Sequence, residues 1–331
     1  MTASRIGSMR VIEASGAGGP EVLFATRRNA PTANSGEVIV KVAYAGVNGP
    51  DLMQRRGLYP APAGATKILG LEVAGEIAST GVNTHRWKVG DRVCALTNGG
   101  GYAEYCSVLE AHCLPIPDGM DLADAASLPE AYFTIWSNVF MGAGLRSGEV
   151  LLVHGGAGGL GSAAIQLATY FGATVVATDS PRQRLDFCAS LGAARTIDYA
   201  VEDYVEIVRG TFGGADVIVD IVGGSNIQKN MKAARHDGRI VQLAFAQGAT
   251  VQLDVTPLML KRLHYTGSTL RSRSDTFKSE VARQLETEVW PLFPQRRLKA
   301  VVGRILALEE AANAHRLMES AAHSGKIVLK I

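Results

Sequence analysis

The chain has 331 residues, a length that exceeds one ordinary hydrophobic core and predicts two domains. Hydrophobic residues make up 47% of it and charged residues 19%, which is the profile of a compact globular protein and not of a disordered one. Its 33 basic and 31 acidic side chains leave a formal charge of +2, so the charge balance does not indicate nucleic acid as a partner.

The cysteines and the apolar runs indicate the compartment. Four cysteines occur and none forms a C-x-x-C pair, so we expect reduced thiols and a cytoplasmic protein. No basic segment followed by an apolar one stands at the N-terminus, and no run of about 20 apolar residues occurs, so we expect neither a signal peptide nor a membrane span. Residues 1–8 are expected to be an extension without a role.

The first third of the chain has the pattern of short β-strands. Residues 37–47 (EVIVKVAYAGV) alternate apolar and polar side chains, which is the period of a half-buried strand. Residues 68–78 and 91–96 have a similar pattern, with turn-forming residues between them. This part of the sequence predicts a β-rich domain of the sandwich or barrel type.

The middle of the chain alternates strands and helices. Residues 149–154 (EVLLVH) are continuously apolar apart from their ends, as expected for a parallel strand covered on both faces. Helices are then predicted at 159–171, 181–191, 201–211 and 225–233, and strands at 173–178, 195–197, 216–221 and 239–243. This alternation is typical of a doubly wound parallel sheet.

The tail of the chain, from about residue 272, is too short to build a core of its own. Its pattern predicts a helix at 277–293, a strand near 301–306, a helix at 308–320 and a last strand at 327–330. We therefore predict that the tail returns to complete the N-terminal β domain.

The strongest local signal is a glycine loop. It combines G-x-G-x-x-G at Gly156, Gly158 and Gly161 with a strand directly before it and a helix directly after it. Gly156 allows the tight turn, Gly158 lets the backbone approach a pyrophosphate, and Gly161 lets the helix pack closely on the strand. The free N–H groups at the start of the helix then favour the phosphates of a dinucleotide.

The end of the second strand of this unit bears on the choice of dinucleotide. Asp179 lies 18 residues after Gly161, where a carboxylate accepts hydrogen bonds from ribose hydroxyls and disfavours a 2′-phosphate. Arg182 and Arg184 follow within one turn, and either is a candidate partner for a 2′-phosphate or a solvated side chain. The sequence alone leaves NADH and NADPH both open.

Further motifs complete a pattern that covers nearly the whole chain. They are GVNGPD at 46–51, QRRGLY at 54–59, ILGLE at 68–72, PEAYFT at 129–134, GSTLR at 267–271 and GKIVL at 325–329. With the glycine loop, they resemble the zinc-free quinone oxidoreductases (zeta-crystallin-like) of the medium-chain dehydrogenase/reductase superfamily, and most closely the p53-inducible quinone oxidoreductase branch.

The resemblance implies an α/β fold with a Rossmann doubly wound parallel sheet inserted in a GroES-like β-rich catalytic domain. The catalytic domain is expected to comprise residues 9–131 and 272–331, and the dinucleotide-binding domain residues 132–271. The implied activity is transfer of hydride from NADPH to a small quinone-like acceptor, with NADH possible because of Asp179.

The resemblance also makes two substitutions informative. Zinc-dependent alcohol dehydrogenases of this superfamily carry Cys and His ligands, but Asn48 stands where the first Cys would be and Leu71 where the His would be. Zinc requires thiolate, imidazole or carboxylate ligands, which neither residue supplies. No metal is therefore expected, and a quinone needs little Lewis-acid help because its reduction creates an aromatic ring.

The resemblance assigns the site residues as expectations. Asn48 and Thr134 are expected at the nicotinamide end, and Tyr59 in the acceptor cleft. Asp51 and Glu72 are interpreted as structural hydrogen-bonding residues, and His154 as a core histidine. The cofactor-binding set comprises Gly156, Ala157, Gly158, Gly159, Leu160 and Gly161 at the pyrophosphate, Asp179, Ser180, Arg184 and Tyr199 at the adenosine ribose, Phe245, Leu270, Arg271 and Ser272 toward the nicotinamide, and Lys326 at the phosphates.

Two other functions stay open on the same scaffold. One is a zinc-free enone or enoyl-thioester reductase, in which Tyr59 would supply a proton. The other is a dinucleotide-binding protein with a structural or regulatory role, because fold alone does not fix function. A homodimer is expected through an exposed edge strand near residues 265–270.

Overall fold

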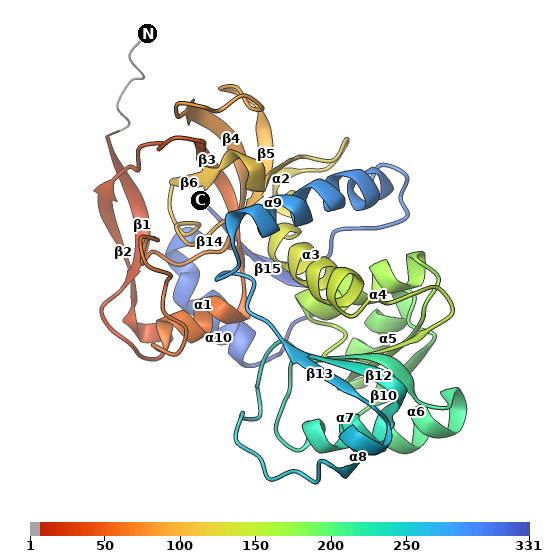
Figure 1. The fold of residues 1–331 in the computed structure, drawn as a ribbon. Coiled ribbons are helices and arrows are strands. Elements are labelled where there is room, and N and C mark those ends of the chain that lie inside the picture. The colour runs from red at the N-terminus through yellow and green to blue at the C-terminus, as the bar shows by residue number, and fades with distance from the viewer. Residues whose placement is uncertain (1–6) are drawn as a thin grey trace. The chain divides into compact units, whose positions relative to one another are not determined.

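The computed structural model describes residues 7–331, which form two compact units (Figure 1). One unit combines the described residues up to Phe133 with Arg271–Ile331, and the other is Thr134–Leu270. Most of the predicted extension, residues 1–6, lies outside the described residues, and the first strand begins at Ser8. No helix in the described part of the chain is long and apolar enough to cross a membrane.

The first unit is built on a mainly antiparallel sheet of order β14-β15-β3-β4-β5-β7, in which β6 also pairs with β3. Its strands are β3 (Glu37–Val47), β4 (Glu72–Thr80), β5 (Arg92–Leu96), β6 (Tyr105–Leu109), β7 (Cys113–Pro115), β14 (Val302–Ala307) and β15 (Lys326–Lys330), and a separate hairpin consists of β1 (Ser8–Ala14) and β2 (Leu23–Asn29). Its helices are α1 (Gly49–Arg55), α2 (Leu122–Ala125), α9 (Asp275–Gln284) and α10 (Ala311–Glu319), and α3 (Pro129–Ile135) crosses the unit boundary.

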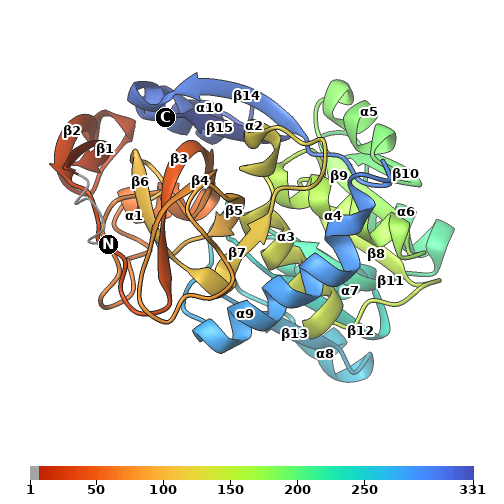
Figure 2. The ribbon, with the colours of Figure 1, turned by 90° about the horizontal axis from the view of Figure 1, so that it is seen from above.

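The tail of the chain completes this sheet, as predicted from its being too short to build a core of its own. Strand β15 pairs antiparallel with β3, with Ile327 opposite Val47, and Figure 2 shows β14, β15 and α10 together in blue. The inward residues of β3, among them Val38, Val40 and Val42, join Ile327 in one apolar core. The tail and β3, which are distant in sequence, are therefore held together by burial of apolar surface, which stabilises the fold by about 25 cal/mol for each Å² removed from water.

The second unit is a doubly wound sheet of six parallel strands, which confirms the predicted fold class. The order is β10-β9-β8-β11-β12-β13, so the direction of winding changes between β8 and β11. Its strands are β8 (Val150–His154), β9 (Thr174–Asp179), β10 (Arg195–Asp198), β11 (Ala215–Asp220), β12 (Ala234–Gln242) and β13 (His264–Gly267). Its helices are α4 (Gly159–Tyr170), α5 (Arg182–Ser190), α6 (Tyr204–Phe212), α7 (Asn226–Ala233) and α8 (Thr256–Leu260).

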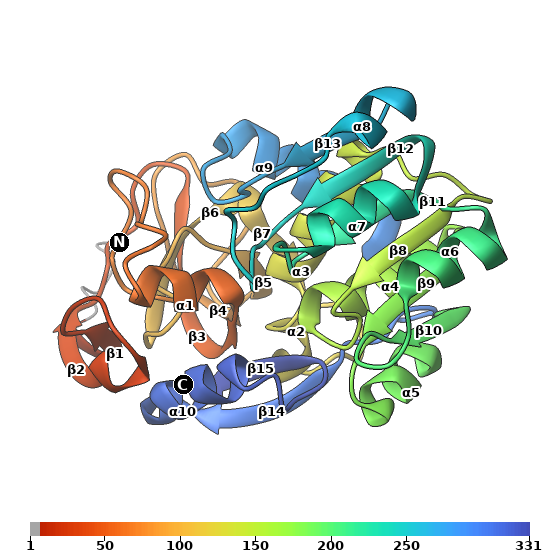
Figure 3. The same ribbon diagram turned by 90° about the horizontal axis from the view of Figure 1, so that it is seen from below.

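The helices of this unit cover both faces of the sheet. Helices α6 and α7 pack beside each other on one face (Figure 3), where Val208 and Met231 meet the strand residues Leu152 and Ile218 in one core. Helices α4 and α5 pack against β8, β9 and β10. The switch of winding at β8 and β11 is where such sheets bind ligands, at the carboxyl ends of the strands.

Several predicted elements begin or end at other residues than those observed, as β12 and α6 do, and two of the differences have a clear physical cause. The helix predicted at 277–293 ends as α9 at Gln284. It continues as a π-helical turn at Leu285–Val289 and a 3-10 turn at Trp290–Leu292, because Pro291 has no N–H to donate and crowds the preceding turn. The strand predicted from residue 68 begins only at Glu72. Gly70 adopts φ +98° there and donates its N–H to Asp51 instead of to a neighbouring strand.

Candidate functional site

The glycine loop joins β8 to α4. Gly155 adopts φ +69°, and Gly158 is the residue directly before α4. A Cβ on Gly161 would lie 2.3 Å from the carbonyl oxygen of Gly155, and one on Gly156 would lie 2.8 Å from Cys188 Sγ. Both positions therefore require glycine for packing, as the motif predicts.

Gly158 differs from these two. A Cβ there would make only ordinary contact, 3.4 Å from Gly155 O, so packing within the protein does not require glycine. The first N–H groups of α4 have no acceptor within the helix, and the helix dipole adds positive potential at the same end. The loop thus fits the pyrophosphate of a dinucleotide, and Gly158 leaves room for it beside these donors.

Asp179 lies at the end of β9, and its carboxylate is fully engaged. It accepts hydrogen bonds from the backbone N–H of Ala157 (2.8 Å) and of Ser180 (2.9 Å), and it pairs with Arg184 at 2.6 Å. Only 3% of Asp179 is exposed. The carboxylate therefore ties the glycine loop to β9, a role that the sequence reasoning missed because the spacing also matches a ribose ligand.

Four predicted adenosine-end residues lie together at the ends of β9 and β10. The backbone N–H of Tyr199 donates to the carbonyl of Asp179 (3.4 Å), and the ring of Tyr199 is exposed. Ser180 and Arg184 both contact the Asp179 carboxylate. This cluster offers an exposed aromatic ring and a guanidinium next to a carboxylate whose charge is balanced.

A buried polar network lies at the ends of β8, β9 and β11, next to the glycine loop. Of its members, only His154 was identified from the sequence, as a core histidine. His154 bonds to Thr178 Oγ1 through Nδ1 and to Asn230 Oδ1 through Nε2, both at 2.8 Å. Asn230 donates to Asp220 Oδ2 (2.9 Å). Burial lowers the pKa of His154, so the ring is neutral and connects the ends of β8, β9 and β11.

The other predicted residues of this unit are more dispersed. Thr134 is buried, and its carbonyl accepts hydrogen bonds from Ser137 Oγ and Asn138 Nδ2. Phe245 is 47% exposed, and a Cβ on Gly223, which adopts φ +67°, would lie 2.8 Å from Phe245 Cδ1. Leu270 is half-buried at the end of the unit.

The first unit holds a second cluster, around Asn48. Asn48 precedes α1, and its Nδ2 donates to Glu72 Oε1 (2.9 Å). The ammonium of Lys326 contacts both Asn48 Oδ1 and, at 2.5 Å, Glu72 Oε1. Glu72 Oε2 accepts from the backbone N–H of Glu130 (2.8 Å), so an amide, a carboxylate and an ammonium form one buried group.

Lys326 therefore has a position that the sequence reasoning did not anticipate. The motif GKIVL suggests contact with phosphates, but the Lys326 side chain is only 4% exposed and its ammonium contacts Asn48 and Glu72. The sheet register explains this: Ile327 lies opposite Val47, so the adjoining residues Lys326 and Asn48 come together.

Asp51 fixes the backbone on which Asn48 stands. Its carboxylate accepts from the N–H groups of Asn48 and Gly70, both at 2.9 Å, and burial, together with this carboxylate, raises the pKa of the Tyr102 hydroxyl. Tyr102 in turn contacts His315 Nε2 (3.1 Å). Burial raises the pKa of Asp51 to about 6, although the two backbone hydrogen bonds favour its ionised form.

Tyr59 and Arg271 form a third group in this unit. The guanidinium of Arg271 lies 5.9 Å from the centre of the Tyr59 ring, and it donates to Asn98 O and to Gln54 Oε1. Burial raises the pKa of Tyr59, so its hydroxyl keeps its proton at neutral pH. The side chain of Arg271 therefore connects Tyr59 with Asn98 and Gln54, and Ser272 next to it is exposed.

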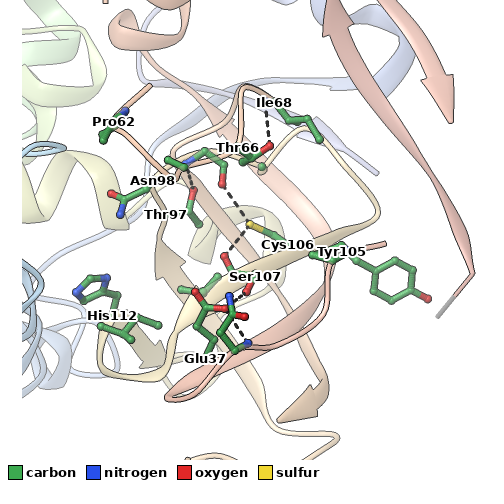
Figure 4. Close-up of a pocket in the computed structure, with 18 of the residues that line it drawn as sticks. Glu37, Pro62, Thr66, Ile68, Thr97, Asn98, Tyr105, Cys106, Ser107 and His112 are labelled. Carbon is green, nitrogen blue, oxygen red and sulfur yellow. Dashed lines mark hydrogen bonds between the residues drawn. The ribbon is translucent and has the colours of Figure 1, made fainter. Parts of the chain in front are cut away.

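A cavity of about 570 Å³ lies in the same unit (Figure 4). Thr66, Asn98, Cys106 and His112 are among its lining residues, and Asn98 is also the acceptor for Arg271. None of Asn48, Tyr59 and Lys326 lines it. Burial raises the pKa of Cys106 to about 12, so this thiol stays protonated and unreactive.

Metal-ligating side chains do not converge in residues 7–331: no group of three or more His, Cys, Asp or Glu side chains is arranged as a metal site would require. At the Asn48 cluster, the oxygens of Asn48 and Glu72 are already bonded to the Lys326 ammonium. A cation would have to displace this ammonium, so the donor set fits a metal poorly.

Known proteins resemble the chain over almost its entire length. The family model "Alcohol dehydrogenase GroES-like domain" matches residues 34–118, and "Zinc-binding dehydrogenase" matches residues 159–287. The quinone oxidoreductase of Mus musculus is 30% identical over 330 residues, which is 97% of each chain.

Solved structures are similar over the same extent. The quinone oxidoreductase of Escherichia coli, complexed with NADPH, has a TM-score of 0.88 at 26% identity and covers 97% of this chain and 100% of its own. An NAD-dependent alcohol dehydrogenase has a TM-score of 0.84 at 30% identity, covering 98% and 99%. The chain therefore belongs to the quinone oxidoreductase family within the medium-chain dehydrogenase/reductase superfamily.

Proposed function

We propose that the protein is an NAD(P)H-dependent quinone oxidoreductase that transfers hydride to a small quinone-like acceptor without a metal ion. The observation that carries this proposal is the Asn48–Glu72–Lys326 cluster. Its only cation is the Lys326 ammonium, and its oxygens are bonded to that ammonium or to N–H groups. A quinone suits such a site, because the aromaticity of the product drives its reduction and no Lewis acid is needed.

NADPH is the favoured cofactor in this proposal, and NADH is the alternative. The bound reduced dinucleotide supplies the hydride. Arg184 supports NADPH because its guanidinium balances the charge of Asp179 and thereby reduces the repulsion of a 2′-phosphate. The N–H groups at the start of α4 hold the pyrophosphate, and the Asp179 carboxylate keeps the loop in place through Ala157.

The acceptor is proposed to bind near Asn48 and Tyr59. The Tyr59 hydroxyl keeps its proton, since burial raises its pKa, and it is suited to donate a hydrogen bond to an acceptor oxygen. Thr134 is proposed to lie at the nicotinamide carboxamide, with Phe245, Leu270 and Ser272 toward the same ring.

Assembly and location complete the proposal. We propose a homodimer in which the edge strand β13 pairs with the same strand of a second copy. We also propose that residues 9–131 and 272–331 form the catalytic domain and that residues 132–271 form the dinucleotide-binding domain. Strand β13 supports the dimer because it ends the six-stranded sheet. Four free, buried cysteines support a reducing, cytoplasmic location.

The test is steady-state oxidation of NADPH and of NADH, side by side, with 1,4-benzoquinone and with an enone of similar size. The proposal expects faster kcat/KM with NADPH and with the quinone. Preference for NADH would overturn the cofactor assignment alone. Turnover of the enone without turnover of the quinone would establish the reductase alternative, and binding without any turnover would leave a dinucleotide-binding protein.

A further inference from the structure

The side-chain amide of Asn48 is held between two groups of opposite charge. Its Nδ2 donates to Glu72 Oε1 at 2.9 Å, and its Oδ1 accepts from the ammonium of Lys326. Asn48, Glu72 and Lys326 are all buried. The arrangement is thus desolvated, which strengthens each of these interactions compared with water.

The two partners leave the amide a single orientation. A carboxylate accepts hydrogen bonds only, and an ammonium donates them only. Turning the amide over would place Nδ2 against the Lys326 ammonium and Oδ1 against the Glu72 carboxylate. Both contacts would then be repulsive and unbonded, which is costly for buried groups.

The locked amide has one hydrogen left to offer. Nδ2 carries two hydrogens, and the bond to Glu72 uses one of them. Oδ1 is occupied by Lys326. What Asn48 presents to a ligand is therefore a donor N–H, which selects an oxygen that accepts a hydrogen bond, such as a carbonyl, over a hydroxyl that must donate one.

We propose that Lys326 is a positioning residue that, with Glu72, locks Asn48 as a hydrogen-bond donor to the carbonyl oxygen of the acceptor. This inference rests on the proposed function and specifies how its acceptor is recognised. It replaces the expectation that Lys326 binds cofactor phosphates, because the ammonium is turned into the Asn48 cluster.

The backbone around the cluster is built to hold it. A Cβ on Gly46 would lie 1.9 Å from Glu72 Oε1, so glycine is required for the carboxylate to lie against β3. Gly325, directly before Lys326, adopts φ +74°, and its Cβ would lie 2.3 Å from Val301 O. Gly46 is thus explained by the Glu72 carboxylate, and Gly325 by the tight backbone turn against Val301 that leads into Lys326.

The donor matters most during reduction. The acceptor gains a hydride from the cofactor and a proton from solvent, which together convert a quinone into a hydroquinone. Negative charge develops on the acceptor oxygen between these two events, and a fixed donor at that oxygen is then strengthened. A freely rotating amide would spend part of its time with its oxygen toward the acceptor.

The experiment removes the lock without leaving a buried charge. The double variant Lys326→Met/Glu72→Gln keeps Asn48 but replaces both ions with neutral side chains of similar length. The control Arg239→Met/Glu149→Gln neutralises another ion pair, at 2.6 Å in the second unit, whose members are not among the proposed site residues. Thermal unfolding of both variants establishes that they fold.

Three quantities are measured: kcat with 1,4-benzoquinone, the Kd of NADPH from its fluorescence, and the Kd of tetramethyl-1,4-benzoquinone for the NADP⁺ complex, where no hydride is available. For the Lys326→Met/Glu72→Gln protein we expect kcat to fall about 10- to 100-fold and quinone binding to weaken. We expect the Kd of NADPH to change less than about twofold, and the control to behave as wild type.

Each other outcome overturns a distinct claim. Weaker NADPH binding with unchanged kcat would make Lys326 a phosphate ligand, and wild-type values throughout would overturn the lock. If the wild type binds the quinone without reducing it, the proposed function fails. The comparison of quinone Kd between wild type and variant then still tests whether Lys326 and Glu72 fix the orientation of Asn48. A wild type that neither binds nor reduces quinones overturns both.

Discussion

The guanidinium of Arg184 forms a two-point ion pair with the carboxylate of Asp179, with Nε 2.6 Å from Oδ1 and Nη2 3.2 Å from Oδ2. The sequence places these side chains in competition, since one favours NADH and the other NADPH. In the structure the two side chains act together: Asp179 holds the glycine loop by accepting from the N–H of Ala157, and Arg184 balances the negative charge of Asp179.

Replacing Arg184 is therefore expected to affect the two cofactors unequally. Arg184→Met should lower kcat/KM for NADPH by about tenfold or more, the value of one charge-assisted phosphate contact. The kcat/KM for NADH should fall much less, because NADH has no 2′-phosphate. Steady-state kinetics with both cofactors check this, and equal losses would show that Arg184 acts only through the loop.

The glycine loop offers a matched pair of substitutions. Gly158→Ala meets no close atom in the protein, so the melting temperature should stay near that of wild type while NADPH binding weakens about tenfold. Gly161→Ala places a Cβ 2.3 Å from Gly155 O and should destabilise the fold by about 1–3 kcal/mol. Calorimetry and cofactor titration separate these effects, and unimpaired NADPH binding by Gly158→Ala would count against the pyrophosphate site.

Activity is expected to fall as the pH drops through about 6, because Asp51 becomes protonated there. Burial raises the pKa of this carboxyl to about 6, and below that value it no longer accepts fully from Asn48 and Gly70. The pH profile of kcat measures this fall. A profile that is flat between pH 7 and 5 would contradict the role of Asp51.

The stability carried by Asp51 has the opposite pH dependence. Because its folded-state pKa is raised, the folded chain takes up the proton first, so this contribution is fully present below about pH 3.8 and is lost as the pH rises through about 6. The melting temperature of wild type minus that of Asp51→Asn should therefore grow on acidification from pH 7 to 5. A difference that shrinks would mean that the carboxyl is stabilised in its ionised form.

Tyr59→Phe separates the two reductase chemistries. The hydroxyl keeps its proton because burial raises its pKa, so it is available as a donor. We expect quinone turnover to fall less than about tenfold, since a quinone needs no protein acid, and enone turnover to fall about 10²-fold if enones are reduced at all. An equally large loss for quinones would make Tyr59 a proton donor in both reactions.

Strand β13 is expected to form the dimer contact. It is an edge strand of four residues, His264–Gly267, and Thr266 on it is exposed. Thr266→Asp would bring two like charges together across a two-fold axis and should favour monomers. Light scattering measures the mass, and a wild-type monomer would remove the basis for this prediction.

The regular elements could be predicted because their patterns are local. Strand β3 and helix α4 begin at the predicted residues, since alternation and glycine punctuation are properties of the nearby sequence. The ion pair of Lys326 with Glu72 could not be predicted in this way, because it joins residues 254 positions apart through the pairing of β15 and of β4 with β3. Position in the family motif indicated only that Lys326 mattered.

The engagement of Asp179 was hidden for a related reason. Spacing places a carboxylate at the end of β9, but only the fold shows that Ala157 and Arg184 already occupy its lone pairs. The polar network of His154 likewise depends on α7, which brings Asn230 to the end of β8. Hydrogen-bond partners distant in sequence leave no periodic signal.

Metal-free reduction of a quinone is tested by NADPH oxidation with 1,4-benzoquinone, using protein of known metal content. Chelator-treated protein, with metal determined by mass spectrometry, is compared with protein incubated with zinc. We expect turnover to be undiminished at less than about 0.1 metal ion per chain and zinc to add nothing, because the Lys326 ammonium holds the oxygens of Asn48 and Glu72. Turnover that rises in proportion to bound metal would contradict this expectation.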